Sequence, residues 1–472
     1  MRRWPGHGEP PLVLDASGSV AHLVSRRYAW GVALMVVALA VTDYIDRQIV
    51  VSTFPYLKKE WGLSDTALGA LVTTVSVTIA LFALPAARLA DRWGRVRTIA
   101  AMGSAWSLAA LASAVSGNYA QLFVARSLLG VGEAGYGPAG AALLSGYFPQ
   151  RLRATVLSVF QAAGPLGAVL GVVLGGVMAE RFGWRVTLGA FGVPGLLLAL
   201  VFLKVRDYRA PAVSSADDAD GAGGAATADS GAGDALTEDR THPPRQDLAA
   251  TVRELFRSRT AVWCYLGGAF NLVVLSTLYT WLPSYLGRAY GLSSAQAGMK
   301  AALFIFAGFL GAIVFGHVAD RCAVGRPRRR LMVPAVLAAV AWGLLFTAFG
   351  VLSPGGVQYA LIVVAGLAVA AALGTAPAAV IDVVHPSVRA TAVGMATLVQ
   401  NLFGLAIGPV LTGLLSDAFG LGTALAVMPL FCLAAAAVFW LGSRSYEKDF
   451  AAVSGGGPGA MPPDTYEREL SR

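Results

Sequence analysis

The chain has 472 residues, of which 56% are hydrophobic and only 13% are charged, and its net charge is +9. A soluble domain carries about 25% charged residues, so the polar surface here is too small to cover a water-soluble body of this size. We therefore expect lipid to surround most of the chain. The basic excess does not indicate nucleic acid, because the Lys and Arg residues fall in short segments between long apolar runs.

Twelve apolar runs follow one another along the chain, each long enough to cross the bilayer core as a helix of about 20 residues. They cover 28–53, 66–90, 96–115, 119–147, 154–179, 185–203, 261–286, 295–319, 331–352, 358–384, 390–416 and 422–442. Their length and their lack of period-two alternation exclude a membrane β-barrel. We predict an all-α membrane protein with twelve transmembrane helices.

The segments outside these runs are polar. Residues 210–246 are rich in Ala, Gly, Asp and Ser, so we predict a flexible linker there. Residues 247–258 alternate apolar residues with arginines, which favours a short amphipathic helix on the membrane surface, with an ordinary surface helix as the alternative. The linker segment as a whole is 210–258, and the tails are 1–27 and 446–472.

The Lys and Arg residues fix the expected orientation. Most of them lie in segments that the alternation of spans puts on one side, namely Arg2, Arg3, Arg26, Arg27, Arg92, Arg95, Arg97, Arg151, Arg153, Lys204, Arg206, Arg209, Arg321, Arg326, Arg328, Arg329, Arg330, Arg444 and Lys448. By the positive-inside rule this side is cytoplasmic. We therefore predict a multi-pass protein of the bacterial inner membrane with both termini and the linker in the cytoplasm.

The two halves of the chain repeat each other at four registers in the same order. Gly62-Leu63-Ser64 matches Gly291-Leu292-Ser293, and Asp91-Arg92 and Asp320-Arg321 each follow 29 residues after these glycines. Further along, Arg153-Ala154-Thr155 matches Arg389-Ala390-Thr391, and Phe182-Gly183 matches Phe419-Gly420. This repeat predicts two pseudo-symmetric six-helix bundles, at 28–209 and 259–445, that rock about a central site.

Several motifs resemble the major facilitator superfamily over about residues 28–442. They are Ala87-Arg88-Leu89-Ala90-Asp91-Arg92-Trp93-Gly94-Arg95, in which Ala87 replaces the family's opening glycine, then Gly316-His317-Val318-Ala319-Asp320-Arg321, and Arg126-Ser127-Leu128-Leu129-Gly130. Asp46-Arg47, Gly132-Glu133-Ala134 and Gly183-Trp184-Arg185 are similar to the Spinster-type branch. The resemblance implies the major facilitator fold and proton-linked movement of lysophospholipids or related amphiphiles.

Five charged residues fall inside the predicted spans. Asp43, Asp46 and Arg47 share one face of the first helix, and Arg126 and Glu133 lie two turns apart on the fourth. A charge at bilayer depth costs roughly 2.5–3.5 kcal/mol, so such residues usually face a cavity and have a function.

We predict that Asp46 and Glu133 are the protonation sites, because loss of solvation favours the neutral form of a carboxyl group. Arg47, Arg126 and Asp43 would then serve as counter-ions or substrate contacts, since guanidinium suits phosphate and carboxylate. The alternative is a static ion-pair network that holds the two helices together.

The second half offers only mild polar groups at the corresponding depth, and we take Asn271, Tyr279 and Asn401 as possible substrate contacts. An apolar wall there would suit the tail of an amphiphile. The resemblance further implies that Asp91, with Arg92 and Arg95, tethers the bundles on the inner side when the outside is open, and that Asp320 and Arg321 form the second copy of this gate.

These observations predict a proton-coupled secondary transporter for an amphipathic or anionic organic molecule, working by alternating access. The rivals are a symporter of protons with a sugar acid or aromatic acid, and a multidrug exporter. We expect no enzyme activity, because the five histidines are scattered and no catalytic cluster or nucleotide-binding Walker sequence occurs. We expect no metal and no cofactor beyond the proton gradient, no nucleic-acid partner, and a monomer surrounded by lipid.

Overall fold

The structure is a computed structural model, and it describes residues 12–13, 24–209, 253–385 and 388–454. The predicted linker 210–246, the first half of the predicted amphipathic helix (247–252) and the ends of both tails lie outside the described residues. The helices of the first half are α1 (Arg26–Trp61), α2 (Asp65–Trp93), α3 (Arg95–Ala114), α4 (Tyr119–Tyr147), α5 (Gln150–Gly189) and α6 (Gly192–Phe202). Two short parallel strands, β1 (Leu12–Val13) and β2 (Tyr208–Arg209), pair beside them.

The second half repeats this pattern with more interruptions. Its elements are α8 (Arg259–Tyr290), α9 (Ser294–Ala323), α10 (Arg329–Phe346), η1 (Thr347–Val351), α11 (Gly356–Val369), α12 (Ala372–Val383), α13 (Arg389–Gln400), η3 (Asn401–Leu405), α14 (Ile407–Phe419), α15 (Leu421–Val427) and α16 (Leu430–Ser454). The elements η1 and η3 are single π-helical turns within longer membrane-crossing segments.

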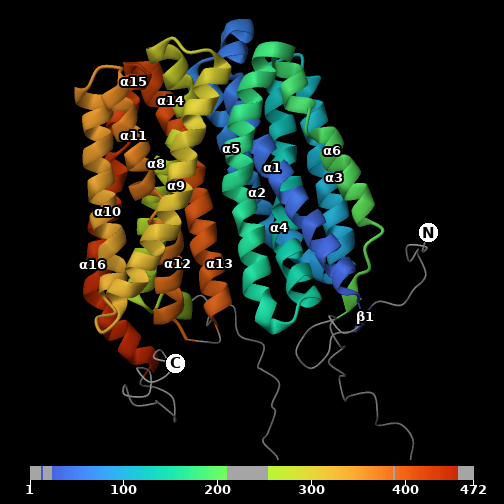
Figure 1. The fold of residues 1–472 in the computed structure, drawn as a ribbon, viewed down its shortest axis with the longest axis vertical. Helices are drawn as coiled ribbons and strands as arrows, with labels where there is room; N and C mark the ends of the chain where they lie inside the picture. The colour runs from blue at the N-terminus through green and yellow to red at the C-terminus, as the bar shows by residue number, and fades with distance from the viewer. Residues whose placement is uncertain (1–11, 14–23, 210–252, 386–387, 455–472) are drawn as a thin grey trace, which may run out of the picture.

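The predicted twelve membrane crossings are present. Within the described residues, nine stretches are long and apolar enough to cross a membrane. One of them, Arg151–Phe202, contains two crossings, because the backbone turns at Gly183, where φ is 77°. The helices α3 and α4 add two more, since they run between the same two ends of the molecule as α2 (Figure 1). Both halves therefore contain six crossings, as the repeat predicted.

Local sequence explains where several helices begin and end. Ser64 and Ser293 cap the first turns of α2 and α9, because each side chain accepts a hydrogen bond from the backbone N–H three residues later. Gly62 and Gly291 end α1 and α8 in the left-handed conformation, at φ 63° and 64°, which a residue with a side chain adopts at a cost. The matched registers of the sequence repeat thus have matched backbone conformations.

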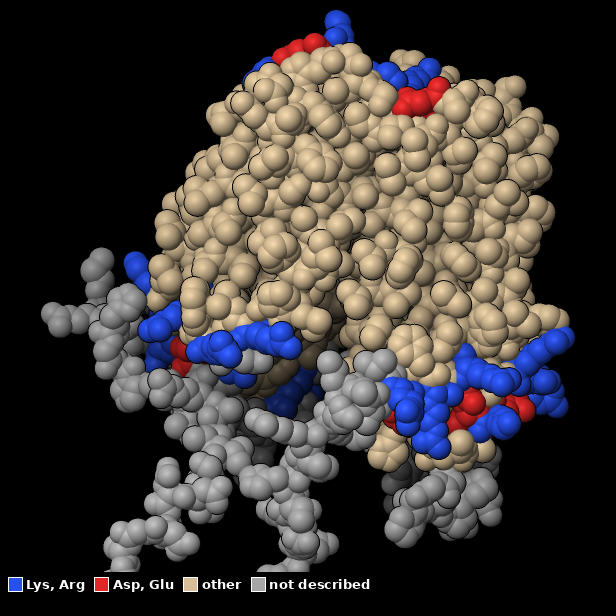
Figure 2. All heavy atoms as spheres, turned by 180° about the vertical axis from the view of Figure 1, so that it is seen from behind, with Lys and Arg blue, Asp and Glu red and all other residues tan. Residues whose placement is uncertain are grey.

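The helices form two groups that stand side by side, α1–α6 in one and α8–α16 in the other (Figure 1). Figure 2 shows a body whose sides are free of charged residues in this view, with Lys and Arg gathered along one end and a recess there between the two halves. We call this the basic end. It carries the junctions at Gly94 and Gly325, where α2 meets α3 and α9 meets α10.

The buried cores are divided unequally along the membrane axis. Towards the basic end each half has its own core, around Val36 and Tyr147 in the first half and around Ala379 and Phe439 in the second. At the opposite end, which we call the closed end, one core continues through both halves and includes Phe54 of α1 and Trp281 of α8, with ring centroids 5.4 Å apart. The halves are therefore packed together where this shared core lies.

Candidate functional site

The charged residues of α1 and α4 come together in the middle of the first half. Arg126 Nη1 lies 3.1 Å from Asp46 Oδ2, which joins the two helices by a charged hydrogen bond. Asp46 is fully buried and Arg126 is 1% exposed. Because neither group reaches water, removal of either would leave an uncompensated buried charge.

A second set of ion pairs joins the same two helices. Arg47 bridges two carboxylates, with Nη2 2.9 Å from Glu133 Oε2 and Nε 3.3 Å from Asp43 Oδ2. The hydroxyl of Tyr136 donates to Asp43 Oδ2 at 2.6 Å, and the Arg47 guanidinium lies over the ring of Tyr44, 5.1 Å from its centroid. The structure thus brings together all five charged residues that the sequence singled out.

The cluster holds more carboxyl groups than cations. It contains three carboxyl groups, Asp43, Asp46 and Glu133, but only two guanidinium groups. Oxygens of all three carboxyl groups are buried without a hydrogen-bond partner among the described residues. Unpaired buried charge is costly, and this cluster holds one more acidic group than its two cations can balance.

Arg47 is the most accessible member of the cluster. Its side chain is 28% exposed, whereas the side chains of Asp43, Asp46 and Glu133 are fully buried. A guanidinium carries five donors, more than its two carboxylate partners use. Arg47 is therefore the group through which this cluster can meet a charged ligand.

The predicted contacts of the second half, Asn271, Tyr279 and Asn401, have surroundings of their own. The amide of Asn271 donates to the Val369 carbonyl at 2.7 Å and so joins α8 to α11. Tyr279 packs edge-on against Phe304, with ring centroids 6.2 Å apart. Asn401 is partly exposed and begins the π-helical turn η3, a feature that is frequent at functional sites.

The predicted gate residues lie at the basic end. Arg92 and Arg321 are exposed in the last turns of α2 and α9, and Arg95 begins α3. Asp320 Oδ1 lies 3.1 Å from Arg330 Nη2, so this pair links α9 to α10 within one half. The side chain of Asp91 lies outside what the structure describes, and the gating role of these residues stays a prediction.

Sequence reasoning missed the ion pairs that hold the closed end. Asp65 begins α2 and is 2% exposed. Its two oxygens accept a bidentate pair of hydrogen bonds from Arg288 of α8, at 2.6 and 2.7 Å, and further bonds from Lys58 and Ser416. Arg288 and Ser416 belong to the opposite half, so Asp65 joins the two halves. An acidic residue at a helix start, on the end with few charges, was the available signal.

Asp417 of α14 strengthens the same closure. Its carboxylate accepts hydrogen bonds from the backbone N–H groups of Asp65 and Thr66, both at 2.8 Å, and from the Thr66 hydroxyl at 2.6 Å. It therefore caps α2 from the other half of the molecule, where the helix dipole favours negative charge. Close backbone approach completes the contact, since a Cβ on Gly413 would lie 2.5 Å from the Asp65 carbonyl oxygen.

Comparison with known proteins adds relatives over most of the chain. The family model described as Major Facilitator Superfamily matches residues 36–405. An MFS-type efflux pump of Mycolicibacterium smegmatis is 28% identical over 461 residues, which cover 93% of this chain and 98% of the relative. A gallate transporter of Pseudomonas putida is 30% identical and covers 73% of this chain and 76% of its own length.

A solved structure shares the fold. The crystal structure of a bacterial homologue of the human lysosomal transporter Spinster, inward-facing and unoccupied, superposes with a TM-score of 0.76. It covers 90% of this chain and 99% of that protein at 22% sequence identity, so the likeness concerns the fold. This neighbour shows that the chain has the fold that the sequence resemblance implied.

Proposed function

This chain belongs to the Major Facilitator Superfamily and is a multi-pass membrane transporter, and we propose that it couples protons to the movement of an amphipathic organic anion. The observation that carries the proposal is the buried cluster of three carboxyl groups and two guanidinium groups between α1 and α4. An imbalance of this kind at bilayer depth supports a bound proton, and intramembrane ionisable groups mark proton relays in transporters.

Glu133 is the group we assign to the moving proton. It contacts Arg47 alone among the described cations, while Asp46 is held by Arg126. When Arg47 turns towards an anionic substrate, Glu133 loses its counter-ion and takes up a proton, because a buried carboxylate without a partner is disfavoured. Release of the substrate returns Arg47 to Glu133 and expels the proton. Substrate and proton would therefore bind together.

The apolar surroundings in the second half support a substrate with an apolar part. Val274 and Leu275 of α8 are buried, and the register of the sequence repeat aligns them with the charged turn of α1. An amphiphile could place its anionic group at Arg47 and its tail towards the second half. The lysophospholipid-like molecule that the sequence resemblance implied has such a charged head and apolar tail.

A second candidate is the symport of protons with an aromatic carboxylate. The relative named as a gallate transporter favours it, because it is 30% identical over 73% of this chain. A multidrug exporter is the third candidate, supported by the relative named as an efflux pump. Direct comparison of substrates separates these three.

The charge distribution supports an orientation with the basic end in the cytoplasm of a bacterial cell, and both termini on that side. In this orientation the Asp65 closure faces outward and the recess between the halves opens inward (Figure 2). We infer an inward-open state of an alternating-access cycle.

Flux measurements in proteoliposomes test the proposal. We expect a pH gradient to drive uptake or efflux of one member of a panel that contains a lysophospholipid, gallate and an uncharged drug. Glu133→Gln should abolish gradient-driven flux but retain exchange of labelled for unlabelled substrate. Glu60→Gln is the matched control, because Glu60 pairs with Arg185 at a half-exposed site away from the cluster.

Two results would count against the proposal. Flux that is independent of the pH gradient in the unaltered protein would remove proton coupling. Full gradient-driven flux in the Glu133→Gln variant would remove Glu133 from the mechanism and leave the ion pairs a structural role.

A further inference from the structure

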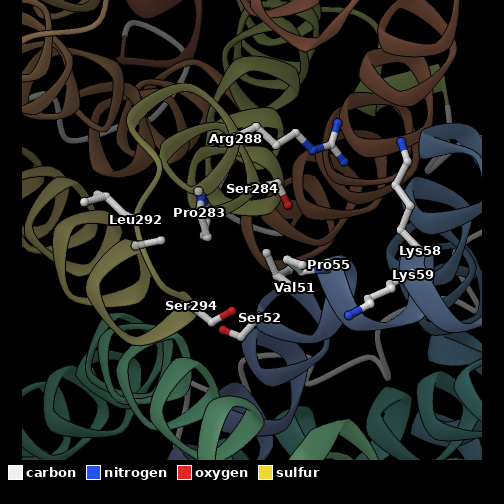
Figure 3. Close-up of a pocket in the computed structure, with 12 residues that line it drawn as sticks. Val51, Ser52, Pro55, Lys58, Lys59, Pro283, Ser284, Arg288, Leu292 and Ser294 are labelled. Carbon is white, nitrogen blue, oxygen red and sulfur yellow. The ribbon is translucent and has the colours of Figure 1, made fainter.

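A pocket of about 390 Å³ opens between the two halves at the closed end, apart from the cluster of α1 and α4. Its walls come from the last turns of α1, the end of α8 and the start of α9 (Figure 3). At about 30 Å³ per molecule, this space would hold on the order of ten waters, and it falls within the range of small-molecule sites. It is therefore large enough for a small organic ligand.

The charged residues of the lining are all cations. Lys58, Lys59 and Arg288 line the pocket, and no acidic side chain does so. Lys58 and Arg288 already bind Asp65, which lies behind the wall. Lys59 has no ion-pair partner among the described residues, and Figure 3 shows its amine turned towards the hollow. The pocket thus has a positive charge to offer an anion.

A buried hydroxyl in the same wall also lacks a partner. Ser284 is 2% exposed, and its Oγ makes no hydrogen bond within the described part of the chain. Its neighbour along the helix, Pro283, has no N–H, and Figure 3 shows the hydroxyl directed into the space between α1 and α8. A buried polar group without a partner is costly, which points to a ligand atom as its missing acceptor.

Most of the remaining lining side chains are apolar, namely Val51, Pro55, Pro283, Leu292 and Ala297, and Ser52 and Ser294 add two hydroxyl groups. An inorganic anion would leave the apolar side chains without a contact. We propose that this pocket binds a small organic carboxylate with a compact apolar body, with one carboxylate oxygen on Lys59, the other on Ser284, and the body against the apolar walls. The site is independent of the proposed transport mechanism, since it shares no residue with the Arg47 cluster.

Binding of benzoate to the purified full-length protein tests this site. Isothermal titration at low salt should give a dissociation constant for benzoate that rises about tenfold in Ser284→Ala, which removes a hydrogen bond to a charged group. Lys59→Gln should raise it by up to about fivefold, because Lys59 is exposed and its charge is screened. Added salt should weaken binding to the unaltered protein.

Two matched variants keep the result interpretable. Lys300→Gln removes a positive charge from α9 that lies over Tyr359, outside the pocket, and Ser113→Ala removes a buried hydroxyl from α3. Both should bind benzoate as the unaltered protein does. Benzyl alcohol has the ring without the charge and should bind at least tenfold more weakly than benzoate, a ratio that corresponds to about 1.4 kcal/mol.

The outcomes separate this site from the proposed transport site. Equal binding of benzoate by the unaltered protein, Lys59→Gln and Ser284→Ala would refute the proposed carboxylate site in this pocket. Loss of binding in Arg47→Gln alone would place the carboxylate in the central cluster instead. Weaker binding in the two pocket variants, with Arg47→Gln unaffected, would uphold the pocket even if proton-coupled flux were absent.

Discussion

Removal of the charge of Asp65 should open the closed end of the molecule. In Asp65→Asn the side chain keeps its size, but the bidentate pair with Arg288, at 2.6 and 2.7 Å, loses its ionic character. The pair with Lys58 lies within the first half, so the contacts of the Asp65 side chain that favour closure are those with Arg288 and Ser416.

The size of the effect follows from burial. Asp65 has a 3% exposed side chain, whereas the side chain of Arg288 is 37% exposed. Exposed pairs contribute about 0.2–1 kcal/mol, and the loss of one partner from a buried pair costs about 3–5 kcal/mol. A half-exposed pair should therefore contribute about 2 kcal/mol, which corresponds to a shift of roughly 30-fold in the ratio of closed to open molecules.

Spin labels across the closed end measure this shift. Val115 follows α3 and Val357 lies in the first turn of α11, and they are 81% and 69% exposed, so cysteines placed there would accept labels. Cys322 is partly exposed and would be replaced by serine so that it takes no label, whereas Cys264 and Cys432 are buried and can remain. Pulsed electron–electron double resonance should show a larger population at long label-to-label distance in Asp65→Asn.

The control is a carboxylate whose pair does not cross the halves. Glu60→Gln removes the carboxylate that pairs with Arg185, which lies in the same half, and should leave the distance distribution unchanged. If Asp65→Asn also leaves it unchanged, the Asp65 contacts do not determine closure and the reasoning fails.

Two further predictions concern stability. Arg126→Gln leaves Asp46 buried without a cation and should destabilise the folded protein by about 3–5 kcal/mol. A thermal-stability assay in detergent should show that stability recovers when Asp46→Asn is added. Equal losses of stability in the single and double variants would contradict the ion-pair account. Gly132→Ala puts a Cβ 2.5 Å from the backbone nitrogen of Trp106 and should lower the melting temperature. Gly137→Ala meets open space, so it should leave the melting temperature unchanged or raise it, with a gain of up to about 1 kcal/mol in folding free energy. Equal melting temperatures for the two variants would show that α3 and α4 separate freely at this point.

Much of the site was predictable because charge inside a membrane span is costly and therefore conspicuous. Asp43, Asp46 and Arg47 lie three and four residues apart, and helical geometry alone puts them on one face. Their partners on α4 were also identified, but the pairing of Arg47 with Glu133 and of Arg126 with Asp46 needs the antiparallel register of the two helices, which no local pattern specifies.

The sequence alone determined the twelve crossings, their grouping into two similar halves and the presence of charge in the first half. These features depend on hydropathy and on repeats along the chain. An apolar segment in the bilayer core must satisfy its backbone hydrogen bonds internally, so it forms a helix. Only the tertiary structure decided which end is closed. Arg288 and Asp417 lie 223 and 352 residues from Asp65 in the sequence, and their contacts with it arise where the two bundles meet. The pocket beside them exists for the same reason, since its walls belong to both halves.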